Sequence, residues 1–106
     1  MDPHRIGERR SLALHRVVAA RCREQPQLLH RAVEVFERWA QAEHMSPKDI
    51  ETWRALFALG HDAVLRAITA DDPSGRELRG TSPFAVLLAP RERWKLWSDV
   101  LAGSAP

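Results

Sequence analysis

Residues 26–41 read PQLLHRAVEVFERWAQ and form the clearest amphipathic pattern in the chain. Polar side chains, among them Arg31, Glu34 and Glu37, fill the positions between apolar ones that recur three or four residues apart. This spacing puts the apolar residues on one face of an α-helix. Pro26 suits the first turn, because its missing N–H would have no partner there. The predicted buried face comprises Leu29, Ala32, Val33, Phe36, Trp39 and Ala40.

The segment before this helix has a helical pattern of its own. Leu14, Val18 and Cys22 lie four residues apart and make one apolar row. Ser11 is a favoured N-cap residue, because its side-chain oxygen can accept a hydrogen bond from the first turn. We therefore predict a helix from about Ser11 to Arg23, with the apolar row facing the core.

The segment after residue 41 contains several short helices separated by breakers. Ser46 and Pro47 form a strong helix start, and Gly60 suits the position just after a helix end. Pro90 opens the last helix, because proline is favoured at the first helical position. The predicted apolar face of that last helix is Trp94, Trp97, Val100 and Leu101. Further helical segments are predicted at about His61–Thr69, around Arg76–Arg79 and from Ser82.

Together these segments predict the fold class. No period-two alternation typical of strands persists, and no heptad repeat lasts three turns. We predict an all-α fold, a compact bundle of about five to seven short helices. Residues 1–8 are predicted to be a flexible basic arm, residues 9–102 a single helical domain, and residues 103–106 a frayed tail.

The composition favours a protein of the reducing cytoplasm. Cys22 is the only cysteine, so neither an intramolecular disulfide nor a cysteine zinc knuckle can form. Residues 1–10 carry charges and no apolar run, which argues against a signal peptide. The longest apolar stretch, residues 84–89, is too short to span a bilayer. We therefore expect a cytoplasmic protein with no membrane partner.

The sequence contains no pattern typical of a catalytic or metal site. No two histidines lie three or four residues apart, so no helix presents a two-histidine metal clamp. We predict a non-catalytic protein with no metal and no cofactor. The histidines are predicted to be surface or capping residues: His4, His15, His30, His44 and His61.

Positive charge is concentrated at the beginning of the chain. Residues 1–23 carry six arginines and two acids, whereas residues 24–62 carry four basic and seven acidic residues. An arginine-rich arm and first helix can follow the phosphates of a nucleic acid. A small DNA-binding transcriptional regulator is therefore one functional hypothesis. Its contacts would be Arg5, Arg9, Arg10 and Arg16.

Aromatic and basic residues gather near the end of the chain. Trp39 and Trp53 each lie on an apolar helical face, and we expect them to pack in the core. In residues 84–97, three aromatic residues stand among arginines and a lysine. Tryptophan and arginine are enriched at the energetic centres of protein interfaces. Core packing is one explanation, and contact with a partner protein or a second copy of the chain is another. The partner-binding residues would be Phe84, Arg93, Trp94 and Trp97.

Five stretches taken together resemble a known group of proteins. They are Arg10–His15, Pro26–Leu29, Glu37–Trp39, Leu78–Ala85 and Pro90–Trp94, in that order. They resemble short helical bacterial antitoxins of toxin–antitoxin modules, which accompany a larger toxin, often of the nucleotidyltransferase type. The resemblance spans about residues 9–101 and contributes no catalytic residue. It implies a helical protein that neutralises a cognate toxin by direct binding, and antitoxins often also repress their own operon.

Overall fold

Helices account for nearly all of the regular structure. The computed structural model describes residues 2–103. Over that range the chain forms six α-helices, one short 3-10 helix (η1) and no β-strand, which confirms the predicted all-α bundle. The elements are α1 (Pro3–Glu24), α2 (Gln27–Gln41), α3 (Pro47–Ala58), α4 (His61–Ile68), α5 (Pro73–Arg79), η1 (Ala85–Leu87) and α6 (Pro90–Leu101).

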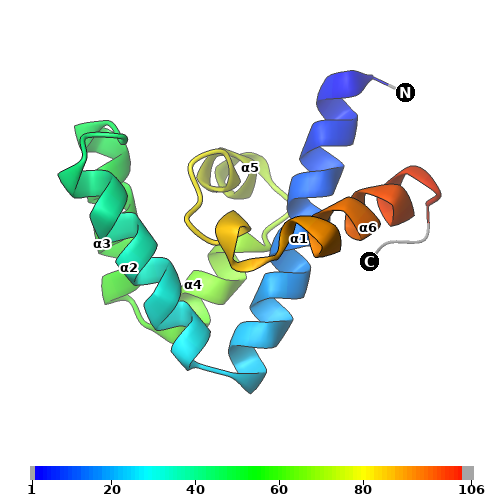
Figure 1. The fold of residues 1–106 in the computed structure, drawn as a ribbon. Helices are drawn as coiled ribbons and strands as arrows, with labels where there is room; N and C mark the ends of the chain where they lie inside the picture. Colours follow the sequence, from blue (N-terminus) through cyan, green and yellow to red (C-terminus); the bar gives the residue numbers. More distant parts are fainter. Residues whose placement is uncertain (1, 104–106) are drawn as a thin grey trace.

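The longest helix, α1, is the element around which the others are arranged. It contacts α2, α4, α5, α6 and η1. Figure 1 shows α1 and α2 diverging from a tight turn as two arms, with α3 beside α2 and α6 crossing α1. Because α4 contacts α1, α3 and α5, it joins the two arms.

The first helix begins much earlier than predicted. Asp2 is its N-cap, since Oδ1 accepts a hydrogen bond from the backbone N–H of His4 at 3.1 Å, and Pro3 occupies the first turn. Asp2 provides a capping oxygen, as Ser11 would, and Pro3 is favoured in the first turn of a helix. The predicted start at Ser11 is therefore wrong, and residues 3–8 belong to α1 rather than to a separate arm.

Other predicted boundaries agree with the structure. The Ser46 side chain caps α3, and Gly60 follows α3 with a φ of 102°, a conformation that other residues rarely adopt. At the end of the chain, α6 ends at Leu101 and Gly103 has a φ of 76°. Residues 104–106 of the predicted tail lie outside the described residues.

Two segments of the second half differ from their predictions. Helix α5 begins at Pro73, because Asp72 Oδ1 accepts a hydrogen bond from the N–H of Gly75 at 2.7 Å and caps it. It is therefore a helix of two turns rather than one turn around Arg76. The segment from Ser82 forms only the short η1, not an α-helix.

The core confirms the apolar row predicted on α1. Leu14, Val18 and Cys22 are all buried and pack with residues of α2, α4 and α6. Burial raises the pKa of the Cys22 thiol, so the side chain behaves as a small apolar core residue rather than a reactive thiolate.

Four aromatic rings, two of them on α3, pack together in the core. We call them the aromatic cluster: Phe36, Trp53, Phe57 and Phe84. The ring centroid of Phe57 lies 5.4 Å from that of Phe36, 5.6 Å from Trp53 and 6.4 Å from Phe84. Trp53 has no exposed surface, and its Nε1–H donates a hydrogen bond to Thr81 Oγ1 at 2.9 Å. The prediction for Trp53 is therefore confirmed, whereas Trp39 is only partly buried.

His15 ties α1 to the segment that leads into η1. Its Nδ1 lies 2.7 Å from the Ser11 carbonyl oxygen, and its Nε2 lies 2.7 Å from Ser82 Oγ. A carbonyl can only accept, so Nδ1 donates and the Ser82 hydroxyl donates to Nε2. Ser82 Oγ also accepts from the N–H of Phe84 at 3.0 Å. His15 is buried, so its prediction as a surface or capping residue is wrong.

Candidate functional site

Helix α6 has one buried edge and one exposed apolar edge. Leu96 and Val100 are buried in the core, where α6 packs against α1. On another face, Trp94 is 70% exposed and Leu101 is 61% exposed, with the partly buried Trp97 between them. Residues three, four and seven apart share a helix face, so these three form one line. We call this line the α6 stripe: Trp94, Trp97 and Leu101.

Two contacts with α1 hold α6 in place. The guanidinium carbon of Arg10 lies 5.5 Å from the ring centroid of Trp97, a cation–π arrangement. Near the start of α6, Arg21 forms a hydrogen-bonded ion pair with Glu92. Arg21, together with the N–H of Ala89, lowers the pKa of Glu92. These contacts add to the buried packing of Leu96 and Val100 between α6 and α1.

The predicted partner-binding residues do not all reach the surface. Trp94 is exposed, whereas Trp97 and Arg93 are partly buried, and all three lie on α6. Phe84 has no exposed surface and packs in the aromatic cluster, 6.1 Å from the Trp53 ring. The prediction that Phe84 contacts a partner therefore needs correction. The exposed Leu101 joins the candidate set instead.

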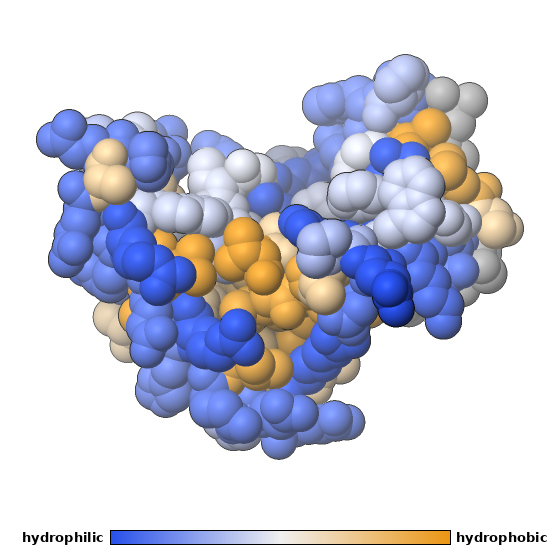
Figure 2. Space-filling view, in the orientation of Figure 1, coloured by the Kyte–Doolittle hydropathy of each residue, from blue (hydrophilic) through white to orange (hydrophobic). Residues whose placement is uncertain are grey.

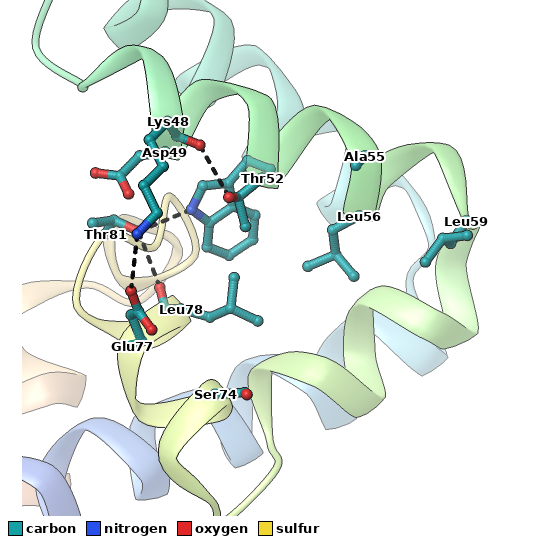
Figure 3. A pocket seen from close by; sticks show the side chains of 11 residues that line it. Lys48, Asp49, Thr52, Ala55, Leu56, Leu59, Ser74, Glu77, Leu78 and Thr81 are labelled. Atoms are coloured by element: carbon teal, nitrogen blue, oxygen red, sulfur yellow. Dashed lines mark hydrogen bonds and ion pairs between the residues drawn. The ribbon is translucent and has the colours of Figure 1, made fainter.

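A second apolar surface lies between α3 and α5, and we call it the α3–α5 groove. Figure 3 shows Leu56 of α3 and Leu78 of α5 facing the same cavity of about 400 Å³. At one end, Lys48 Nζ lies 4.0 Å from Glu77 Oε1, and at the other Leu59 is 73% exposed. The groove could accept an apolar side chain, with a weak ion pair at one end.

A third apolar surface faces the space between the two arms. Figure 2 shows apolar side chains gathered in the hollow between α2 and the side of the molecule formed by α1 and α6. A cavity of about 350 Å³ there is lined by Leu28 of α2 and by Leu87 and Leu88 near η1, with Arg21 and Arg31 also in its lining. The bundle thus leaves apolar surface uncovered in more than one place.

The predicted nucleic-acid contacts separate into two groups. Arg5, Arg9 and Arg16 line one cavity of about 350 Å³, whereas Arg10 lies over Trp97. The structure adds two arginines of α5 to the first group, and the lining of this arginine cavity is Arg5, Glu8, Arg9, Leu12, Arg16, Asp71, Arg76 and Arg79.

Sequence patterns alone did not assign Arg76 and Arg79 to any site. Their signal was present, because Asp72 and Pro73 form a helix start. A helix beginning there puts residues 76 and 79 on one face. That this face meets α1 near Arg16 depends on the tertiary packing of α5, which local patterns do not report.

Within residues 2–103, no group of three or more histidine, cysteine or acidic side chains is arranged to hold a metal ion. In the same range, none of the helices combines the length and the apolar character needed to cross a bilayer. Comparison with protein-family models, with curated proteins and with solved structures finds no match to this chain. What the protein binds must therefore be inferred from its own surfaces.

Proposed function

We propose that this protein is a cytoplasmic, non-catalytic antitoxin that neutralises a toxin by direct contact through the α6 stripe. The observation that carries the binding role is the 70% exposure of Trp94. The resemblance of five stretches of the chain to antitoxins supports the kind of partner. Arg93 and Trp97 complete the proposed contact surface, and Phe84 has no part in it.

The spacing of the stripe suits a partner groove. Leu101 lies seven residues after Trp94, which separates the two side chains by about 10 Å along one helix face. An aromatic side chain removes about 150–250 Å² from water when it is enclosed. A tryptophan inserted into a pocket is typical of the few residues that provide most of the energy of an interface.

The charges beside the stripe indicate the chemistry of the partner. Arg91 and Lys95 are both exposed on α6, on either side of Trp94 in the sequence. The charged side chain of Glu92 is already engaged by Arg21. A complementary surface would combine an apolar pocket with an acidic rim, since opposite charges speed association and fix orientation.

Co-expression with the product of the neighbouring gene tests this function. We expect that product to arrest bacterial growth alone and the wild-type chain to restore growth. The double variant Trp94→Ala, Leu101→Ala should weaken the complex by about 30-fold or more, because it removes residues of the hot-spot class. Isothermal titration calorimetry with the purified partner measures this loss.

Leu59→Ala is the matched control, because Leu59 is as exposed as Trp94 but lies just after α3, at its C-cap. It should restore growth and bind as the wild type does. A neighbouring product that is harmless alone, or toxic beside the wild-type chain, would rule out the antitoxin. Equal affinities of the stripe variant and the Leu59→Ala variant would rule out the α6 stripe as the contact surface.

A further inference from the structure

The arginine cavity between α1 and α5 lies apart from the α6 stripe and has no role in the proposed function. The geometry points to a binding site for a small ligand that carries phosphate groups, of about the size of a nucleotide. Four observations support this site: a rigidly held arginine, a close approach of two backbone segments, an excess of positive charge, and the dimensions of the cavity.

Arg79 is the rigidly held group. It is only 6% exposed, and its Nη1 donates hydrogen bonds to the carbonyl oxygens of Ile68 at 3.1 Å and Ala70 at 2.7 Å. These bonds occupy one nitrogen of a guanidinium that carries five N–H donors. The planar group is therefore oriented in advance, which lowers the entropy lost when a ligand binds.

Gly75 allows this arrangement. A Cβ atom at position 75 would lie 2.0 Å from the Ala70 carbonyl oxygen and 3.0 Å from Arg79 Nη1. Only a glycine lets α5 approach the end of α4 closely enough for Arg79 to reach those carbonyls. The close approach of α5 to the end of α4 therefore determines where the Arg79 side chain lies.

Positive charge exceeds negative charge in the cavity lining. Five arginines line it, against Glu8 and Asp71. Arg76 contacts both carboxylates only at long range, with Nε 4.0 Å from Glu8 Oε1 and Nη1 3.8 Å from Asp71 Oδ1. Burial lowers the pKa of Arg79; Asp71 and Asp72 oppose this change, and Arg76 and Arg16 add to it. A multiply charged anion would relieve this repulsion.

The cavity fits phosphate groups on a small molecule better than a nucleic-acid duplex. Its volume of about 350 Å³ lies at the lower end of the usual range for small-ligand sites. Arginine forks match the oxygens of phosphate in pairs. The apolar side chain of Leu12 also lines the cavity and could contact an uncharged part of the ligand. A duplex backbone needs a continuous basic surface, whereas Glu8 and Asp71 interrupt the arginines of this lining.

Titration calorimetry with pyrophosphate and with ATP tests this site. We expect saturable binding at physiological salt, weakened about tenfold by Arg16→Gln, because a hydrogen bond to a charged group is removed. Arg16 is exposed, so its substitution should leave the fold intact. Arg79→Gln should weaken binding further, and thermal unfolding shows whether that variant stays folded.

Arg23→Gln is the control, because Arg23 is an exposed arginine of the same helix outside the cavity. It should bind both probes as the wild type does. Absence of saturable binding, or equal weakening by Arg23→Gln and Arg16→Gln, would overturn the site. A short DNA duplex that binds and is not displaced by either probe would also overturn it, in favour of a nucleic-acid surface. None of these outcomes bears on the α6 stripe, whose test uses a protein partner.

Discussion

The aromatic cluster and the α6 stripe each contain a tryptophan, yet only the cluster encloses it. Trp53 has no exposed surface, donates a hydrogen bond to Thr81 and packs within 5.6 Å of the Phe57 ring centroid. Trp94 is 70% exposed on a helix whose other edge is already packed against α1. The same residue type thus stabilises the fold in one region and remains available for binding in the other.

The largest expected effect of this difference is on stability. Trp53→Ala should lower the free energy of unfolding by about 3–5 kcal/mol, because it leaves a cavity in the aromatic cluster and removes the donor to Thr81. Trp94→Ala should change it by no more than about 0.5 kcal/mol, as is usual for exposed positions. Urea unfolding of both variants measures this. A loss above about 2 kcal/mol for Trp94→Ala would show that the indole serves the fold.

Local sequence patterns predicted the first region better than the second. The apolar row of α1 and the burial of Trp53 followed from helical spacing alone. The same spacing grouped Trp94 and Leu101 with Val100 as one apolar face of the last helix, but only Val100 is buried. A helix with two apolar edges can bury either one, and the choice depends on where α1 lies. Tertiary packing therefore separates core from surface here.

The next largest expected effect is on the pH dependence of stability, and it concerns His15, which is hydrogen-bonded to Ser11 and Ser82. Burial lowers the pKa of His15 to about 4, from 6.5 for an ordinary histidine, while its bond to Ser11 and the charge of Arg79 act in opposite directions. The unfolded chain therefore binds a proton more readily between these two values. Stability should be fully present above pH 6.5 and fall by about 3 kcal/mol as the pH drops to 4.

Urea unfolding at several pH values measures this loss, with His15→Gln as the comparison. Glutamine can accept the Ser82 hydrogen bond but does not titrate in this range. The variant should be less stable at neutral pH and should lose less stability than the wild type between pH 6.5 and 4. Parallel curves for the two proteins would assign the acid sensitivity to carboxylates instead. The α6 stripe contains no titratable group, so exposure of Trp94 should not change over this range.

The sites were less predictable than the fold. Arg5, Arg9 and Arg16 were expected to act together because they share the basic beginning of the chain, and they do line one cavity. Arg10 was expected to join them. Because successive residues of a helix are rotated by about 100°, Arg10 points away from Arg9 and toward α6. Arg76 and Arg79 reach the cavity from a helix sixty or more residues later in the chain. The spacing of residues predicts which of them share a helix face, but it does not predict which helix faces pack against one another.

The smallest expected effect is that of removing a cation–π contact. One such contact lies beside the α6 stripe and the other in the aromatic cluster. The Arg10 guanidinium carbon lies 5.5 Å from the Trp97 centroid beside the stripe, and that of Arg54 lies 5.3 Å from the Phe36 centroid in the cluster. Arg10→Ala should lower the free energy of unfolding by about 0.5–1 kcal/mol. Arg54→Ala should lower it somewhat more, because it also removes hydrogen bonds to both carboxylate oxygens of Glu37. Chemical denaturation measures both losses.

The two substitutions should differ in what they expose. Phe36 is buried by its own cluster and should remain so without Arg54, whereas Trp97 is only partly buried and loses the guanidinium that lies over it. In NMR spectra of the amide and indole N–H groups, the Trp97 indole signal should therefore move toward the position of a solvent-exposed indole in Arg10→Ala. It should not move in Arg54→Ala. Because Trp97 lies between Trp94 and Leu101, this variant should widen the exposed stripe without unfolding α6. An unchanged Trp97 signal would mean that packing against α1, not the cation, limits how much of the stripe a partner can reach.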